Sequence, residues 1–155
     1  MRKILICYFS ASGITERIAK NIANILDGDL FHIEPIEDYT EEDLNWRNDN
    51  SRTSIEMKDI SSRPKIKNKI DNINQYDKVI IGFPVWWYTA PRIINSFIEE
   101  NDLTDKDVYT FVTSGGSSHA GSLKDLKDKY TSINFISGKT LNGNISSSEI
   151  IDWIK

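Results

Sequence analysis

The sequence contains a single cysteine, Cys7, and only two histidines among its 155 residues. One cysteine cannot form a disulfide framework, and these few side chains cannot supply the ligand spacings of a zinc site. Low cysteine usage is typical of a reducing compartment, so we expect a cytoplasmic protein. Because Cys7 lies within an apolar run, its position favours a small buried side chain over a redox-active thiol.

Long hydrophobic runs and basic clusters are also missing. The first apolar run ends within about seven residues without a small-residue cleavage site, and no run approaches the ~18 apolar residues of a membrane span. The net charge is −4 and the sequence pI is about 5.2. We therefore expect no signal peptide, no membrane span and no nucleic-acid partner, whereas an acidic surface suits a basic protein partner.

The chain has no Gly/Ser-rich linker and no internal repeat, and its 39% hydrophobic content suffices for one core. We therefore expect a single domain over residues 1–155. Apolar runs of strand length alternate with segments of helical periodicity. The expected strands are residues 3–9, 29–35, 78–84, 107–113 and 133–138, and the main expected helices are residues 16–28, 91–101, 121–130 and 146–155.

This alternation predicts an α/β fold, a three-layer doubly wound parallel sheet of five strands. Ligands bind such sheets beyond the carboxyl ends of the strands, at the topological switch point. The loops after the first, third and fourth strands are therefore the places to look for a site.

One polar segment, residues 35–63, interrupts the pattern. We interpret it as a long connection with one short helix after Thr40, followed by a helix over about residues 65–74. Connections of this length often act as lids or binding loops. Trp46 and Arg52 are its candidates for contacting a ligand, although a Trp46 packed onto the body of the protein fits the pattern equally well.

The first loop, FSASGIT at residues 9–15, is rich in hydroxyl groups. A helix that begins near Thr15 presents free N–H groups and positive dipole there, Gly13 lets the backbone curl, and the hydroxyls add neutral donors. Such a loop suits one terminal phosphate monoester. It lacks the lysine of a P-loop and the further glycines of a dinucleotide fingerprint. An ordinary helix cap by Ser10 or Ser12 explains the turn about equally well.

The other two loops carry aromatic and small residues. The third-strand loop, GFPVWWYTAPR, places Trp86, Trp87 and Tyr88 in succession, and three consecutive aromatics cannot all point inward. At least one should lie exposed at the crevice, where it can stack on a planar heterocycle. The fourth-strand loop, TSGGSSHAGS, allows close backbone approach to the polar edge of a ring.

Taken together and in order, these motifs resemble the flavodoxin family, from KILICYFSASGIT through Arg63 and Pro64 to GKTLNG. The resemblance implies the strand order 2-1-3-4-5 and FMN as the cofactor. It implies that the phosphate is held by Ser10, Ala11, Ser12, Gly13, Ile14 and Thr15, that the isoalloxazine is lined by Pro84, Val85, Trp86, Trp87 and Tyr88, and that its pyrimidine edge meets Ser114, Gly115, Gly116 and Ser117. A tyrosine that covers the outer ring face in well-studied flavodoxins is missing, which leaves that face open to a substrate or to a lid such as Trp46.

The resemblance favours a low-potential electron carrier. A phosphate held by neutral donors in a net-negative protein disfavours further negative charge on the reduced flavin. Glu99, Glu100 and Asp102 could steer the basic face of a redox partner protein, although charge at a helix end is more often plain solvation. We expect no catalytic residue and no metal, and we take a monomer as the starting assumption.

Other functions occur on α/β sheets of this kind. An NAD(P)H-dependent FMN or quinone reductase on the same fold would need cations for the nicotinamide phosphates, for which Arg52, Arg63 and Arg92 are the candidates. A flavin-free α/β binding module is the second alternative. A hydrolase is excluded, because GSSHA only approaches the nucleophile motif and the only histidine after Ser118 is its direct neighbour His119.

Overall fold

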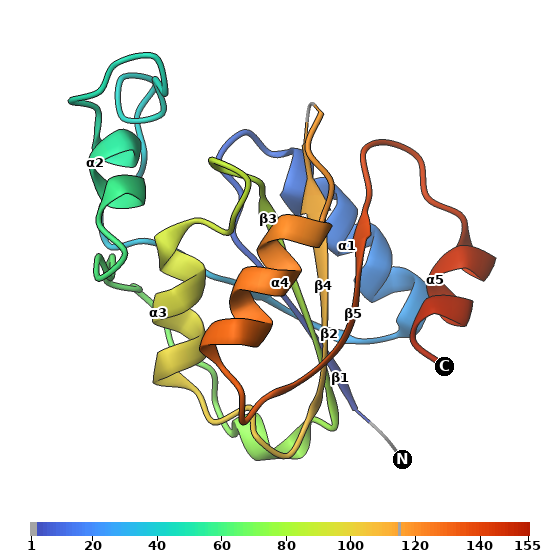
Figure 1. Ribbon diagram of the computed structural model, residues 1–155. Coiled ribbons are helices and arrows are strands. Elements are labelled where there is room, and N and C mark those ends of the chain that lie inside the picture. Colours follow the sequence, from blue (N-terminus) through green and yellow to red (C-terminus); the bar gives the residue numbers. More distant parts are fainter. Residues whose placement is uncertain (1–2, 115) are drawn as a thin grey trace.

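The computed structural model describes residues 3–114 and 116–155 (Figure 1). It contains one parallel sheet with the strand order β2-β1-β3-β4-β5, which confirms the predicted sheet and order. The strands are β1 (Ile4–Tyr8), β2 (Asp29–His32), β3 (Lys78–Pro84), β4 (Asp107–Thr113) and β5 (Asn134–Thr140).

Helices cover both faces of this sheet and give the fold its three layers. The helices are α1 (Ile14–Leu26), α2 (Arg52–Lys58), α3 (Arg92–Glu100), α4 (Ala120–Lys129) and α5 (Ser147–Trp153). Helices α3 and α4 lie on one face and α1 and α5 on the other, while α2 stands away from the sheet (Figure 1). Within the described residues, no helix is long and apolar enough to cross a membrane.

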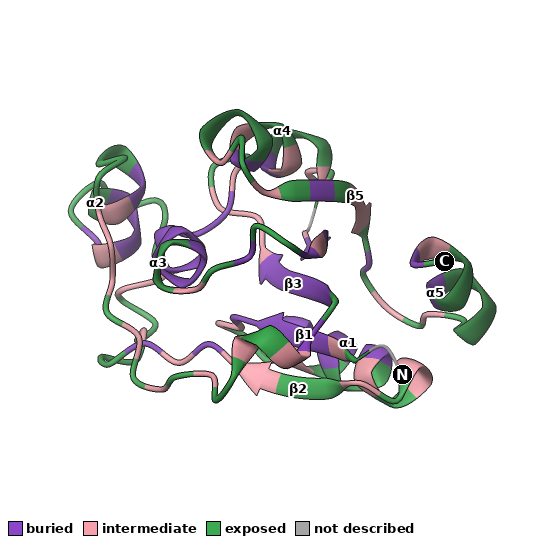
Figure 2. Cartoon of the chain, turned by 90° about the horizontal axis from the view of Figure 1, so that it is seen from below, coloured by how far each residue is buried: buried purple, intermediate pink, exposed green. Residues whose placement is uncertain are grey.

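The central strands are apolar on both faces, and alternate residues therefore enter two different cores. In β1, Leu5 and Cys7 pack on the α3/α4 side, whereas Ile6 and Tyr8 pack on the α1/α5 side. Figure 2 shows β1 and β3 buried, whereas β2 at the edge of the sheet is exposed or intermediate. Cys7 is fully buried and burial raises the pKa of its thiol, which confirms the expected core role.

The prediction of a helix over residues 65–74 is wrong. Residues 65–70 alternate between exposed and partly buried, and Ile66 forms an antiparallel bridge with Pro35. Only a short 3₁₀ helix, Ile73–Gln75, follows. The isoleucines at 66 and 70 are four residues apart, a spacing that fits an extended segment as well as a helix, and here the segment covers the open edge of β2.

The prediction of a helix directly after Thr40 is also wrong, although the hydrogen bonds expected of a Thr40 cap do form. The Thr40 hydroxyl accepts the Asp43 N–H at 3.1 Å, and Asp43 in turn accepts the Thr40 N–H at 3.0 Å. Only turns follow, because Asn45 and Asn48 bond the backbone two residues ahead of themselves. The helix of this connection, α2, begins further on.

Replacing Asn68 by alanine should lower the free energy of unfolding by about 1–2 kcal/mol, because a bridging side chain is lost. The Asn68 amide donates to the His32 carbonyl at 2.7 Å and accepts the Glu34 N–H at 3.3 Å, so it replaces a missing strand at the edge of β2. Urea denaturation measures the change, with Asn74→Ala, at an exposed position nearby, as the control. Equal transitions for the two variants would show that the edge does not depend on Asn68.

Candidate functional site

The predicted anion loop lies at the carboxyl end of β1, where the strand order reverses between β1 and β3. Gly13 immediately precedes α1 with a φ of 92°, a left-handed conformation that favours glycine. Its N–H donates to the Ser10 hydroxyl at 3.1 Å, which closes the loop into a turn. The first N–H groups of α1 have no partner within the helix and face the same end of the sheet.

The hydroxyls of this loop divide into two kinds. Ser12 is exposed, as is the neighbouring Ile14, whereas Thr15 is buried. The Thr15 hydroxyl is 2.8 Å from that of Thr113 at the end of β4, so it ties the start of α1 to the sheet. Ser12 is therefore free to meet a ligand, and Thr15 lies beneath the loop.

A cleft of about 430 Å³ opens beside this loop. Its lining contains a cation that sequence reasoning missed, because that reasoning stopped at Thr15: Arg17, exposed and one turn into α1. Position 17 follows Gly13 by four residues, so helical spacing places it on the same face as the loop. The other lining residues are Ser12, Ile14, Pro84, Val85, Thr113, Ser114 and Asn142. Asn142, also missed, accepts the Ser114 N–H at 2.7 Å.

A second cleft of about 520 Å³ shares Val85 and Ser114 with the first, so the two are adjacent. It is lined by Leu44, Trp46, Thr53, Val85, Trp86, Trp87, Tyr88, Ser114, Gly116 and Ser117. The structure thus brings together the predicted residues of the third-strand and fourth-strand loops. Gly115, also predicted, lies outside the described residues.

The consecutive aromatics form a tight two-residue hairpin. Trp86 and Thr89 exchange two backbone hydrogen bonds of 3.0 Å, and the residues between them, Trp87 and Tyr88, have φ of 49° and 65°. Positive φ is costly for such side chains, and strain of this kind gathers at ligand sites. Trp87 and Tyr88 are 41% and 75% exposed, which confirms that at least one aromatic here lies open at the crevice.

The hairpin also needs a glycine on α4. A Cβ on Gly121 would lie 2.7 Å from the Tyr88 carbonyl oxygen, so only glycine lets the turn approach the helix this closely. The turn is therefore held from outside as well as by its own hydrogen bonds.

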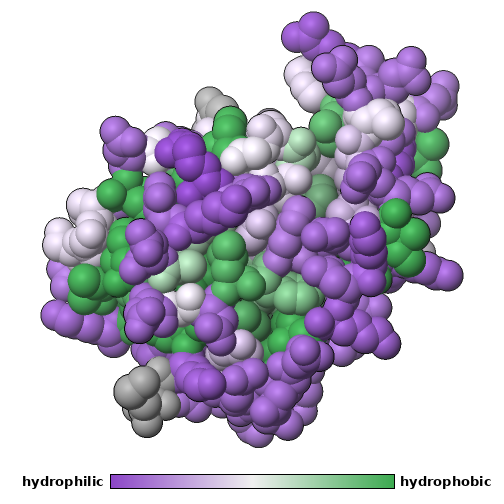
Figure 3. Space-filling model, turned by 180° about the vertical axis from the view of Figure 1, so that it is seen from behind, coloured by the Kyte–Doolittle hydropathy of each residue, from purple (hydrophilic) through white to green (hydrophobic). Residues whose placement is uncertain are grey.

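The opposite wall of the second cleft comes from the long connection. Leu44, Trp46 and Thr53 contribute to it, and Trp46 is 63% exposed. Of the two expectations for Trp46, the structure places it at the cleft and not in the protein body. The connection, at the upper right of Figure 3, is mostly hydrophilic.

The arginines weighed as nicotinamide-phosphate ligands all have partners within the protein. Arg52 donates to Glu56 at 3.0 Å and to the Glu37 carbonyl at 2.7 Å. Arg63 is paired with Glu99 at 2.9 Å. The buried Arg92 donates to the Met57 carbonyl at 2.7 Å. Each guanidinium is thus engaged in holding the connection or the body of the fold.

The acidic group Glu99, Glu100 and Asp102 does not border the clefts. It lies at the carboxyl end of α3, and a helix antiparallel to its strands ends at the opposite edge of the sheet from the binding loops. Glu99 is engaged by both Arg63 and Tyr130, which lower the pKa of its carboxyl. A steering role for this group near the clefts is not supported by its position.

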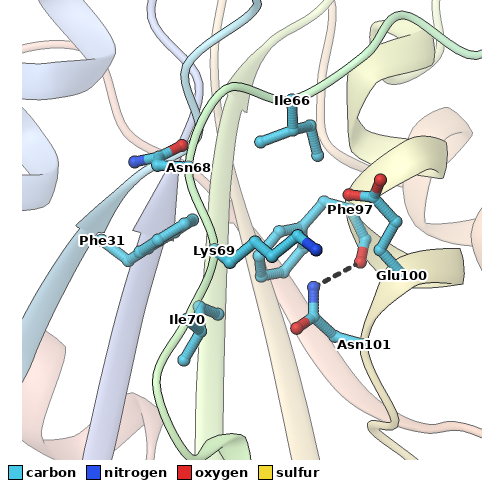
Figure 4. Close-up of a pocket in the computed structure, with 8 residues that line it drawn as sticks. All are labelled: Phe31, Ile66, Asn68, Lys69, Ile70, Phe97, Glu100 and Asn101. Atoms are coloured by element: carbon cyan, nitrogen blue, oxygen red, sulfur yellow. Dashed lines mark hydrogen bonds between the residues drawn. The ribbon is translucent and has the colours of Figure 1, made fainter.

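A smaller cavity of about 250 Å³ lies near these carboxylates (Figure 4). Its apolar part is formed by Phe31, Ile66, Ile70 and Phe97, with Lys69 and Glu100 beside them. The Asn101 amide donates to the Phe97 carbonyl at 2.9 Å at the end of α3. This cavity lies between β2, the 66–70 segment and α3, away from the loops that end β1, β3 and β4.

The two adjacent clefts define what the site can bind. One end offers helix N–H groups, a serine hydroxyl and an arginine, a donor set suited to a phosphate. The other end offers aromatic walls and backbone polar groups, which suit a planar heterocycle. A flat ring system that carries a terminal phosphate fits this donor set.

The fold and site together define a doubly wound α/β protein with a phosphate-type loop beside an aromatic cleft. A family model described as Flavodoxin matches residues 3–155, so the chain belongs to the flavodoxin family. No functionally curated protein matches the chain.

Solved structures share the architecture. A provisionally named flavoprotein of Bacteroides eggerthii DSM 20697 is 47% identical with a TM-score of 0.96, over 99% of this chain and 96% of that one. A similarly named protein of Bacteroides uniformis ATCC 8492 is 45% identical with a TM-score of 0.93, over 99% and 97%. A flavoprotein of Lactobacillus acidophilus NCFM, solved in complex with FMN, has a TM-score of 0.79 at 24% identity, over 100% of both chains.

Proposed function

We propose that this chain is an FMN-binding electron carrier of low potential that acts as a single domain in the cytoplasm. The observation that carries the proposal is the junction of the phosphate-type cleft and the aromatic cleft at Val85 and Ser114. FMN has a phosphate and a planar ring at its two ends, and it supplies one- and two-electron redox chemistry when bound. The FMN complex of the similar Lactobacillus acidophilus protein supports the choice of cofactor.

Each cleft is assigned one part of the cofactor. The phosphate lies in the first loop, residues 10–15, with Arg17 as its cation. The ring lies along residues 84–88 with its pyrimidine edge toward residues 114–117, and Trp46 covers the face opposite the hairpin. Thr15 serves the loop from beneath, because its hydroxyl is shared with Thr113.

Charge near the ring supports a low potential. Between Glu37 and Asp49 the connection carries six carboxylates and one arginine, although the whole chain has a net charge of only −4. The negative charge is therefore concentrated on the segment that forms one wall of the ring cleft. Negative charge at this place disfavours adding more to the flavin, and it attracts a partner with a basic face. This wall replaces the end of α3 as the proposed docking side.

A carrier is preferred over an NAD(P)H-dependent reductase because a nicotinamide dinucleotide brings several further negative charges. Arg52, Arg63 and Arg92 already have internal partners, and the wall beside the ring cleft is acidic. A second anionic ligand would have to approach against that charge. If the protein does not bind FMN, the alternative of a flavin-free binding module is supported instead.

An anaerobic titration of the purified protein with FMN tests the proposal. We expect saturable quenching of flavin fluorescence at one FMN per chain, complete reduction by a low-potential chemical donor, and no reduction by NADH or NADPH within the same time. Fast reduction by either nicotinamide would identify a reductase. Unquenched flavin at every protein concentration would leave only the flavin-free module.

A further inference from the structure

An aromatic cluster lies behind the ring cleft. Trp86 is packed edge-on against Phe9 at a centroid distance of 5.6 Å and against Tyr39 at 5.5 Å, and Phe9 and Tyr39 meet at 5.6 Å. Phe9 directly follows β1 and is 1% exposed, whereas Tyr39 belongs to the long connection. Trp86 is therefore held between the core and the connection.

Tyr39 is in turn fixed by an ion pair. Its hydroxyl donates to one carboxylate oxygen of Glu56 at 2.6 Å, and the other oxygen accepts from Arg52 Nε at 3.0 Å. The Arg52 guanidinium lies 3.8 Å above the centroid of the Tyr39 ring and bonds the Glu37 carbonyl at 2.7 Å. The phenol is thus held in its plane by Glu56 and from above by Arg52.

This network is shielded from water. The side chains of Arg52 and Glu56 are 22% and 12% exposed, so the loss of one member leaves the others with unmet partners in a poorly hydrated place. Burial and the Glu56 carboxylate raise the pKa of Tyr39, so the hydroxyl stays protonated and continues to donate. Such a network specifies one arrangement of the groups that it contacts.

We propose that Tyr39, Arg52 and Glu56 are positioning residues of the ring site, which fix Trp86 in the orientation that receives the flavin ring. The inference rests on the proposed function and deepens it, because it explains how the connection acts on a residue of the sheet. A wall that is already fixed loses less conformational freedom when the ring binds. The network therefore raises affinity at the ring end of the cofactor and not at the phosphate end.

The chain supplies its own matched control. Arg63, Glu99 and Tyr130 form the same trio at the other edge of the sheet: Arg63 bonds both Glu99 oxygens at 3.0 Å, and the Tyr130 hydroxyl donates to Glu99. Tyr39→Phe and Tyr130→Phe thus each remove a hydroxyl that donates to an arginine-paired glutamate, and Tyr130→Phe also removes the acceptor of the Asn95 amide at 3.1 Å. Glu56→Gln and Glu99→Gln form a second matched pair.

Binding of FMN and of riboflavin, which lacks the phosphate, is the first readout. We expect Tyr39→Phe and Glu56→Gln to weaken both ligands by the same factor, about tenfold. The Tyr130 and Glu99 variants should stay within about twofold of the wild type. Urea denaturation measures the stability of all four variants. If affinity were lost only because stability is lost, control variants that are equally destabilised would lose affinity too.

The second readout needs no cofactor. With 5-fluorotryptophan incorporated, the fluorine resonance of Trp86, assigned with Trp86→Phe, should shift or broaden in the apo Tyr39→Phe variant and stay in place in Tyr130→Phe. An unmoved Trp86 resonance overturns the proposal, as does a moved one with unchanged flavin affinity. If the wild type binds no FMN, the proposed function fails, and the fluorine spectra alone decide whether the trio positions Trp86.

Discussion

Arg17→Glu should lower the affinity for FMN about 100-fold and leave the affinity for riboflavin within about twofold of that of the wild type. Arg17 is exposed in the cleft beside the first loop, with Ser12 and Ile14 as neighbours in the lining. A hydrogen bond between charged groups contributes about 1.5–3 kcal/mol, and a carboxylate at the same place adds repulsion to the loss. Fluorescence titration of both flavins separates an effect on the phosphate from one on the ring.

Lys20→Glu makes the same charge change one turn further along α1. Lys20 is 58% exposed and paired with Glu16 at 2.8 Å, and it does not line the cleft. The expected loss of FMN affinity is about twofold to threefold and vanishes as salt screens it. Arg17→Gln should fall between wild type and Arg17→Glu. If the Lys20 and Arg17 reversals are equally harmful, the phosphate responds to the overall field of the helix and not to Arg17.

The fold is readable from the sequence because its strands are buried on both faces. Runs such as residues 79–84 are apolar throughout, and only a parallel sheet with helices on both sides covers them. The errors fall in the connection, where hydrophobic spacing is ambiguous. The spacing of Ile66 and Ile70 fits the period of a helix and that of a strand. Which structure forms depends on the open edge of β2, which belongs to a distant part of the sequence.

The loops that contribute to the candidate site could be predicted from the sequence, but the residues of the connection that form the opposite wall of the cleft could not. Loops at the ends of parallel strands must share one edge of the sheet, so residues 84–88 and the small fourth-strand loop were expected together. That Leu44 and Thr53 would face them depends on how the connection folds back, which no local pattern encodes. Arg17 lies beyond the loop motif, and only its helical spacing of four residues from Gly13 indicates that it lines the same cleft.

Gly82→Ala should destabilise the protein by about 3 kcal/mol and so lower the melting temperature by about 10 °C. Gly82 on β3 lies opposite Phe111 on β4, and a Cβ would lie 2.0 Å from the end of the Phe111 ring. The ring is fully buried between the sheet and the α1/α5 layer, so it cannot move without displacing its neighbours. Calorimetry and urea denaturation of the apo protein measure the loss.

Two further variants separate this clash from a general cost of alanine in place of glycine. A Cβ at the exposed Gly116 enters open space, so Gly116→Ala should leave the melting temperature of the apo protein within about 1 °C. Phe111→Leu shortens the ring that Gly82→Ala strikes, so the double variant should be more stable than the sum of the single losses predicts. Strictly additive losses would contradict the clash and point to the backbone of β3, whose Gly82 carbonyl also accepts the Phe9 N–H at 3.0 Å below the first loop.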